Sequence, residues 1–445
     1  MADLIKLNVR DLAATTETAA CLICGRIHTR TILQETDWLT DQVLDRMTAD
    51  NSGWTPDDGA CPACVQKALL TILLERGESA MQSAIQLTWP LDAEAAFGAL
   101  PTPLRMRAHP HYTGKGVTIA FVDSGFYPHP DLIHPTNRIK AWVDVGSEQV
   151  ETAYFTPDQV PTWRGWDAAM PSQWHGTMTS TAAAGNGYRG HGLYRGIASD
   201  ADLILIQTID ARGAIPNENI LRALNWLEEH AHSLGVRVVN LSLGGDPVDT
   251  LDDNPIDAAI GRLFNAGIAV TVAAGNGGER QLYPPATAPS ALTVGGVDDG
   301  NVFDRGALSL WHSNYGVGIG GVIKPEVVAP SIWVVAPVLP GTDVEREAIE
   351  LFSKRVYHDS PRAQAITERK LVTPYYQHVD GTSFAAPIVA SVIATMIEAD
   401  PALSPRQLVD TIIATAERIP GVPVYRQGYG VINAGAALRM VLDER

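Results

Sequence analysis

The sequence lacks any run of about 18 uncharged apolar residues, the length that a membrane-spanning helix needs. Its first residues contain no basic segment followed by an apolar one, so we expect no signal peptide. Basic residues are also scarce, because 33 Lys and Arg stand against 50 Asp and Glu, for a net charge of −17. Such an acidic surface repels phosphate backbones, and no basic patch interrupts it. We therefore expect neither a membrane nor a nucleic acid among the partners of this protein.

Cysteine is equally rare, and all four copies lie within the first 64 residues. They form two CxxC pairs, Cys21 with Cys24 and Cys61 with Cys64. A secreted enzyme stapled by disulfides would scatter its cysteines along the chain. The pattern favours thiolate chemistry and predicts a cytoplasmic location.

Apolar residues, by contrast, are plentiful enough for a large core. They make up 45% of the chain and charged residues 19%, which excludes disorder and collagen-like repeats. A chain of 445 residues also exceeds one ordinary domain. We expect a small domain over 1–88, a proline-containing linker over 89–104 and a large domain over 105–445.

The large domain alternates short apolar strands with amphipathic helices. The expected strands are 117–123, 201–209, 236–244, 268–276 and 290–297, and the expected helices between them include 219–234 and 257–265. This alternation predicts an α/β fold with a mainly parallel sheet and helices on both faces. In such a sheet the site lies beyond the carboxyl ends of the strands, where Asp123, Ser242 and Asn276 stand.

One charged segment, 341–380, interrupts the alternation. A structureless loop of that length is uncommon in a compact domain, so we expect it to include helix. Because Ser383 follows directly, the segment is expected near the site, as a lid or an autolysis loop.

Four polar residues carry signals that are weak singly and strong together. Ser383 precedes an apolar helix, where free N–H groups can bind a developing oxyanion, although a lone serine there is usually an N-cap. His175 opens a second small-residue helix, while Asp123 and Asn276 end buried strands, where either alone is an ordinary turn residue. Together they supply a nucleophile, its base, a carboxylate to orient the base and an amide donor.

The motifs resemble those of the subtilisin-like serine peptidase (subtilase) family, in family order, over roughly residues 100–445. They read TGKGVTIAFVDSG, HGTMTS, NLSLGG, VAAGN and GTSFAAP. The resemblance implies a serine endopeptidase that forms an acyl-enzyme with protein or peptide substrates. By resemblance, Asp123, His175 and Ser383 are the triad and Asn276 completes the oxyanion hole; this chain order is known from a bacterial subtilisin.

The resemblance further implies which residues bind substrate. The peptide is expected to lie between Ser242-Leu243-Gly244 on one side and the segment containing Gly213 on the other. Gly275 and Thr382, beside Asn276 and Ser383, are assigned to the same role. The family also binds Ca²⁺, but no calcium site can be mapped onto this sequence.

The sequence departs from the family in two places, and two rival readings are weighed against the assignment. Ser124 follows the aspartate where threonine is common, and no segment resembles the family's inhibitory propeptide. The related serine-carboxyl peptidases place a glutamate at position 175 and an aspartate at position 276, so both residues here argue against that class. A binding protein on an inactive scaffold would usually have lost the nucleophile or the base, and neither is missing.

The cysteine pairs predict a metal site. The segment Cys21 to Gly25 looks like a zinc knuckle, and Cys61 and Cys64 begin a helix expected over 62–77. Between the pairs lie 36 residues (25 to 60), more than in common zinc ribbons; the arrangement resembles a treble clef. Four thiolates predict a structural Zn²⁺ within a small α+β domain.

Other readings of the cysteines stay open. His28 could replace one of the cysteines as a ligand. Two redox dithiols or two local disulfides are the rivals to a metal site. A thioredoxin-like redox motif would need a βαβ context, which residues 1–88 lack. We expect this domain to recruit substrate, to bind a protein partner or to restrain the peptidase.

Overall fold

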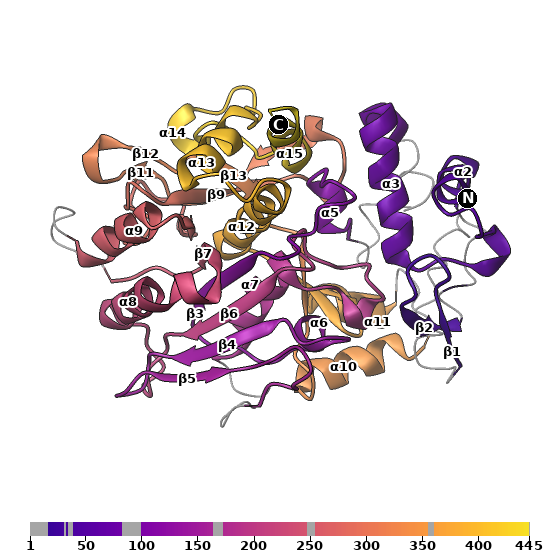
Figure 1. Cartoon of the computed structure of the whole chain (residues 1–445), viewed down its shortest axis with the longest axis horizontal. Helices are drawn as coiled ribbons and strands as arrows, with labels where there is room; N and C mark the ends of the chain where they lie inside the picture. Colours follow the sequence, from indigo (N-terminus) through magenta and orange to yellow (C-terminus); the bar gives the residue numbers. More distant parts are fainter. Residues whose placement is uncertain are drawn as a thin grey trace.

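A central sheet organises the molecule (Figure 1). The computed structural model describes residues 17–30, 33, 39–81, 99–162, 172–246, 254–354 and 360–444. Within these ranges nine strands form the sheet in the order β10-β9-β8-β7-β3-β6-β4-β5, with β13 also paired to β9. The strands are β3 (Thr118–Asp123), β4 (Ile139–Asp144), β5 (Glu151–Tyr154), β6 (Asp202–Gln207), β7 (Val236–Leu241), β8 (Ala269–Ala273), β9 (Leu292–Asp298), β10 (Ser309–Leu310) and β13 (Val327–Pro330).

The register of the sheet places the strand ends side by side. β3 pairs in parallel with β6 and β7, while β4 pairs in parallel with β6. Asp123 therefore lies opposite Gln207, and Gln207 lies opposite Asp144. Every residue of β3 is buried, as expected for a parallel strand covered on both faces.

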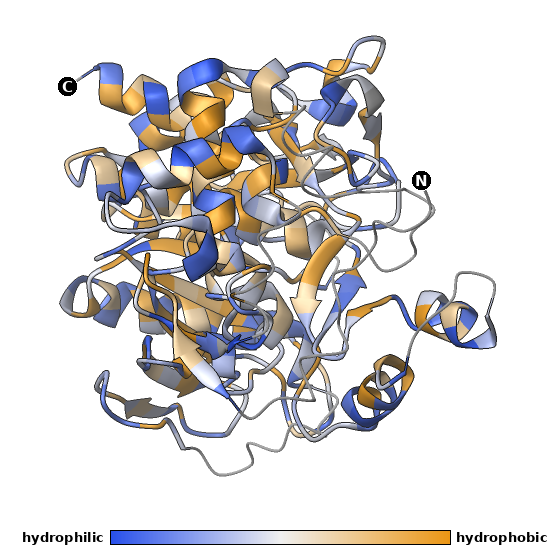
Figure 2. Ribbon diagram, turned by 90° about the vertical axis from the view of Figure 1, so that its right-hand side faces the viewer, coloured by the Kyte–Doolittle hydropathy of each residue, from blue (hydrophilic) through white to orange (hydrophobic). Residues whose placement is uncertain are grey.

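Helices cover both faces of the sheet (Figure 1). α8 (Asn217–Leu234) and α9 (Pro255–Asn265) share one core with the sheet, while α7 (Trp174–Ala184) and α12 (Thr382–Ala399) lie in the other with α13 (Pro405–Ala414) and α15 (Ala434–Asp443). Hydrophobic residues gather in the interior, and the outer turns of peripheral helices are hydrophilic (Figure 2). The predicted α/β architecture with helices on both faces is confirmed.

The helix α12 is the most apolar element of this architecture. Among the described residues it is the one helix long and apolar enough to span a membrane, by length and composition. In the structure 89% of that stretch is buried within the protein. Its apolar character is accounted for by its place in the core, where it packs against α7 and the sheet.

The cysteine-containing residues form a small unit beside the sheet domain (Figure 1). It contains the hairpin β1 (Thr18–Ala20) and β2 (Ile27–Thr29), then α2 (Asp41–Asp50), a 3₁₀ turn η2 (Pro56–Asp58) and α3 (Pro62–Arg76). Pro62 starts α3 where its missing N–H costs nothing, and Gly77 follows at φ +83°. The helix expected over 62–77 is thus present, in an α+β unit.

Part of the expected linker lies outside the described residues. Residues 89–98 belong to that part, whereas Ala99 and Leu100 are buried and α5 (Thr102–Arg105) follows them. The Arg105 guanidinium donates two hydrogen bonds of 2.8 Å to the Asp299 carboxylate. Residues 99–105 therefore pack onto the large domain.

The charged segment 341–380 is structured where it is described. It contains α10 (Asp343–Phe352), α11 (Pro361–Glu368), β15 (Leu371–Thr373) and β16 (Tyr376–Val379), and β16 pairs with β14 (Val334–Pro337). The helices pack on a small core of their own that includes Phe352 and Ile366. The segment includes helix, as expected, and its role as a lid or autolysis loop stays a prediction.

Short elements complete the described chain. They are α6 (Pro130–Ile133), η3 (Tyr188–Gly190), η4 (Arg305–Ala307), β11 (Gly316–Val317), η5 (Ile319–Gly321), β12 (Ile323–Lys324) and α14 (Val424–Gln427).

Candidate active site and cysteine cluster

The carboxylate and the imidazole expected in the triad meet at the end of β3. Asp123 is 1% exposed, and its Oδ1 lies 2.6 Å from Nδ1 of His175 in the first turn of α7. Oδ1 also accepts the Ser124 N–H at 2.7 Å, and Oδ2 accepts the Thr179 hydroxyl at 3.0 Å. These donors hold the carboxylate against the ring. Because Nδ1 of His175 is bound to Asp123, Nε2 is the ring nitrogen that can accept a proton from another group.

The environment of His175 also changes its pKa. Burial lowers the pKa, but the charge of Asp123 and the hydrogen bond to it outweigh burial, so the pKa lies above its usual value. The centroid of the His175 ring lies 5.2 Å from that of Trp174 and 5.9 Å from that of Phe384. Phe384 directly follows Ser383, so the imidazole lies beside the turn that carries the candidate nucleophile.

Ser383 occupies the second position of α12, where backbone N–H groups have no partner within the helix. Its backbone carbonyl accepts the Ser242 hydroxyl at 2.7 Å, which joins the helix start to the end of β7. Its own hydroxyl donates to the Ser242 carbonyl at 3.3 Å rather than to His175. Such a catalytic hydrogen bond often forms only once substrate binds.

Asn276 lies beside the same turn, with its amide orientation fixed. Its Oδ1 accepts both the Thr382 N–H at 2.9 Å and the Thr382 hydroxyl at 2.8 Å. Because the oxygen faces Thr382, the amide NH₂ is the group left to face a ligand. Thr382 is expected by resemblance to bind substrate. In the structure its side chain is fully buried, and it orients the Asn276 amide.

The remaining residues assigned to substrate binding flank this turn. Leu243 and Gly244 follow β7, and a Cβ on Gly244 would meet no atom within 4 Å. Gly213 is equally open in a turn closed by a 2.8 Å hydrogen bond from the Asp210 N–H to the Ala214 carbonyl. By contrast, the Gly275 N–H donates to the Thr382 hydroxyl at 3.0 Å. These backbones leave room for an extended peptide.

Comparison with known proteins identifies the architecture around this site. The model of the subtilase family matches residues 114–430, which include Asp123, His175, Asn276 and Ser383. The chain belongs to the subtilase family. It is thus a member of a family of serine peptidases, and the resemblance read from its motifs is confirmed at this level.

Individual subtilases agree with that assignment. The chain is 27% identical to serine protease AprX of Bacillus subtilis over 331 residues, which cover 72% of this chain and 66% of AprX. It is 28% identical to subtilisin Savinase of Lederbergia lenta over 329 residues, 74% of this chain and 92% of that protein. Among solved structures, a protease from Pseudoalteromonas arctica superposes with a TM-score of 0.54 at 23% sequence identity. The superposition covers 79% of this chain and 97% of that protease, and it supports the fold.

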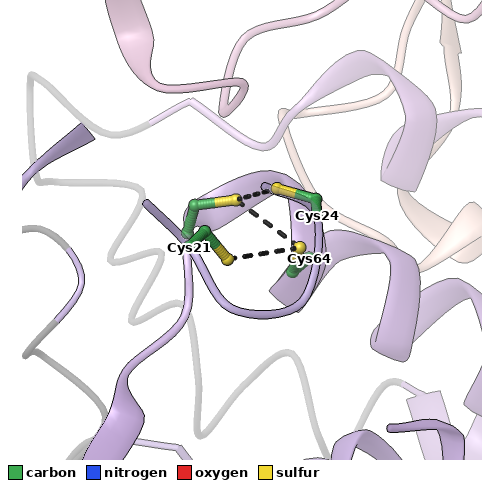
Figure 3. Close-up of side chains that lie close together, drawn as sticks. Cys21, Cys24 and Cys64 are labelled. Atoms are coloured by element: carbon green, nitrogen blue, oxygen red, sulfur yellow. Dashed lines mark hydrogen bonds between the residues drawn. The ribbon is translucent and has the colours of Figure 1, made fainter. Parts of the chain in front are cut away.

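The four cysteines of this subtilase come together outside the family match. All four sulfur atoms lie within 4.8 Å of one another (Figure 3). The sulfur–sulfur distance is 3.9 Å between Cys21 and Cys64, 3.7 Å between Cys24 and Cys61 and 3.5 Å between Cys61 and Cys64. A disulfide needs about 2.05 Å, and the cysteines are free thiols. The shortest of these distances lies within the Cys61–Cys64 pair and the next two join one pair to the other, so the four sulfurs form one cluster rather than two local pairs.

The donor set of the cluster fits a metal ion. Four sulfurs held about 2.3 Å from one tetrahedral zinc ion would lie about 3.8 Å apart, close to the distances here. Hydrogen bonds among the four thiols lower the pKa of Cys24 and raise the pKa of Cys61 and Cys64, so in the absence of a metal ion the cluster does not hold four thiolates. His28 lies beside the cluster, with its Nδ1 3.3 Å from Nδ1 of His191.

Some residues that build the active site were missed by sequence reasoning. Thr179, four residues after His175 and hence on the same side of α7, is one of them. Asn314 is another: its side chain accepts the Gly277 N–H at 2.8 Å and so holds the turn after Asn276. The spacing within the HGTMTS motif could have indicated Thr179, but nothing local marks Asn314.

Proposed function

We propose that this subtilase is an intracellular serine endopeptidase that hydrolyses peptide bonds of protein or peptide substrates. The observation that carries the proposal is the 2.6 Å contact between His175 and buried Asp123, next to Ser383 at the start of α12. A carboxylate in that position fixes the tautomer in which Nε2 can accept a proton.

Each candidate residue has one role in the reaction. Ser383 Oγ attacks the peptide carbonyl while His175 takes its proton, and the oxyanion that forms is bound by the Asn276 NH₂ and the Ser383 N–H. His175 then gives the proton to the leaving amine. Water, activated by the same imidazole, hydrolyses the acyl ester and frees Ser383.

The cysteine unit is proposed to hold a structural Zn²⁺ through Cys21, Cys24, Cys61 and Cys64. A zinc ion there would join the β1–β2 hairpin to α3 and contribute to the folding free energy of the unit. Four clustered cysteines that can share one metal ion differ from the scattered disulfides of secreted proteins, which supports a cytoplasmic location. Recruitment of a substrate or partner and restraint of the peptidase are the functions open to this unit.

A fluorophosphonate probe tests the proposal, because it phosphonylates only a serine activated by an assembled triad. The intact protein should be labelled, and Ser383→Ala should not. Labelling that appears only after removal of residues 1–88 would mean that the unit holds the enzyme latent. No labelling of either form would favour a binding protein on an inactive scaffold.

A further inference from the structure

The cysteine unit rests on one loop of the peptidase domain, residues 187–194. Gln66 on α3 is fully buried and donates its Nε2–H to the Leu193 carbonyl. Gly192 approaches Ala63 so closely that a Cβ at position 192 would lie 2.6 Å from the Ala63 Cβ. Ala63 stands between two of the cysteines, and Leu193 is buried in the same core as the cysteines. The loop therefore packs directly against the metal-binding turn.

Two contacts at the edges extend this interface. His28 in β2 lies 3.3 Å from His191, nitrogen to nitrogen. Glu78, just after α3, forms a 2.6 Å ion pair with Arg107, whose guanidinium lies 4.5 Å from the centre of the Phe303 ring. The unit is thus docked along one side of the peptidase domain.

The other side of the same loop faces β16. A Cβ on Gly190 would lie 2.9 Å from the ring of Tyr376, and the rings of Tyr194 and Tyr376 are 5.3 Å apart. The Tyr376 hydroxyl donates to Asp131 Oδ2 at 2.7 Å, and the Arg189 N–H donates to Asp131 Oδ1 at 3.0 Å. One buried carboxylate therefore ties the loop and the strand together.

Two elements next to this loop lead along the chain to catalytic residues. β16 begins at Tyr376 and leads into the segment that ends at Ser383, seven residues later. Gly381 is held on that path by a 2.8 Å hydrogen bond from its N–H to the Ser331 carbonyl. On the other side, the loop follows α7, whose first turn contains His175.

We propose that the metal-bearing cysteine unit positions the nucleophile. It holds loop 187–194 against Tyr376 and thereby sets the path of β16 into Ser383, so that Gly192, Gln66 and Tyr376 are positioning residues. The inference rests on the proposed peptidase function. It makes the cysteine unit an activator rather than an inhibitor, since docking of the unit favours acylation of Ser383. In the described ranges, no hydrogen bond or ion pair joins the unit to a residue assigned to catalysis or substrate binding, so nothing supports occlusion of the cleft.

The substitution Gly192→Ala tests this proposal at the interface. The new Cβ must push Ala63 away, so we expect hydrogen exchange to rise in residues 61–77 and in residues 376–383. We expect the rate constant for fluorophosphonate labelling of Ser383 to fall about tenfold, within the range of ordinary coupling between sites. Zinc content should stay equal to that of the wild type.

A compensating substitution separates docking from strain in the loop. Ala63→Gly removes the atom that the new Cβ meets, while the φ of +84° at position 192 remains. The double variant should regain the labelling rate and the exchange pattern of the wild type. Gly267→Ala is the matched control, because it has a similar φ of +89° and no neighbour within 4 Å, and should leave both readouts unchanged.

Several outcomes would overturn the inference. Loosened docking with unchanged exchange in 376–383 would mean that the unit and the nucleophile are independent, and faster labelling would mean restraint. If Gly192→Ala does not fold, removal of zinc from the wild type by a chelator gives the same readouts. Exchange reports on the coupling even in a protein that the probe never labels, so failure of the peptidase proposal remains distinguishable.

Discussion

At the scale of single residues, the site depends on a carboxylate kept away from water. Asp123 is buried, but it accepts hydrogen bonds from His175, Ser124 and Thr179, which stabilise its charge. The same charge raises the pKa of His175 against the effect of burial. Since the neutral imidazole is the base, the acylation rate should fall as the pH drops through this pKa.

The substitution Asp123→Asn should change both the height and the position of this pH profile. The plateau rate should fall by about four orders of magnitude, the size known for this change in a serine peptidase of another fold. Without the carboxylate only burial acts on His175, so its pKa should drop and the acid limb should move to lower pH. The measurement is kcat/KM between about pH 5 and 9, the range in which a histidine near its usual pKa titrates.

Asp144→Asn is a suitable control for that experiment, because Asp144 ends the strand two positions away in the same sheet. It should leave the position of the acid limb unchanged. An unmoved limb in Asp123→Asn as well would contradict the role given to Asp123.

A second buried carboxylate affects stability rather than catalysis. Asp257, in the first turn of α9, accepts the Thr287 hydroxyl at 2.7 Å, and burial raises its pKa to about 6. A folded-state pKa above the unfolded value contributes stability below about pH 4, and that contribution is lost as the pH rises through about 6. At about pH 8 the free energy of unfolding of Asp257→Asn should therefore exceed that of the parent, by at most about 2 kcal/mol, and its unfolding temperature should be higher. At about pH 4 the two proteins should differ little.

Thermal unfolding of this variant is best followed in the Ser383→Ala background, where autolysis cannot occur. Asp410→Asn, at an exposed position of α13, should leave the pH dependence of stability unchanged. Equal stability of Asp257→Asn and its parent above the pKa of Asp257 would contradict the role assigned to burial.

At the scale of elements, the helix that carries His175 is held by close contact with the end of β3. Gly176 leaves room for the chain after Asp123, because a Cβ there would lie 2.3 Å from the Gly125 carbonyl oxygen and 2.8 Å from the Phe126 ring. The small residues along α7 allow this approach. The position of His175 is therefore a property of how α7 packs, and not of its own residue alone.

The substitution Gly176→Ala should disturb that packing. We expect a loss of about 1–3 kcal/mol in the free energy of unfolding, the usual cost of overpacking, and a fall in kcat larger than any rise in KM. Gly261→Ala in α9 is the matched control, since its Cβ would meet only the Ser290 hydroxyl at 3.9 Å. It should stabilise the protein by about 0.5–1 kcal/mol, and an equal result for both variants would contradict the close-contact argument.

At the scale of the whole molecule, the small unit and the peptidase domain share one hydrophobic core. Leu193 and Phe303 of the large domain, with Leu100 and Leu104 of the expected linker, are buried with the cysteines. The sheet has two larger cores of its own, one on each face. The folding of the unit should therefore depend on the proposed zinc ion more than the folding of the sheet does.

Chelation of zinc under reducing conditions tests that difference. Hydrogen exchange should rise over residues 41–76, while β3, β6 and β7 keep their protection, because their cores contain no cysteine. Metal analysis of untreated protein should find one zinc per chain. Unfolding of the sheet in step with the unit, or absence of zinc from reduced protein, would contradict this prediction.

The sequence by itself determined the type and order of the elements of the large domain. The apolar runs that become β3, β6, β7, β8 and β9 are continuous because these strands are covered on both faces, and such runs are legible without a structure. The family motifs are local as well, so the candidates Asp123, His175, Asn276 and Ser383 could be named from them. Cysteine spacing likewise indicated which thiols meet.

Only the tertiary structure decided how distant segments come together. Asn314 holds the turn after Asn276, and the buried Thr382 hydroxyl donates to the Asn276 amide oxygen, although neither contact has a local signal. The docking of Ala63 against Gly192 joins residues 129 positions apart in the sequence, through a fit of surfaces that no pattern encodes. The physical reason is that periodicity reports which face of an element is buried, whereas its partner is chosen by shape and by long-range hydrogen bonds.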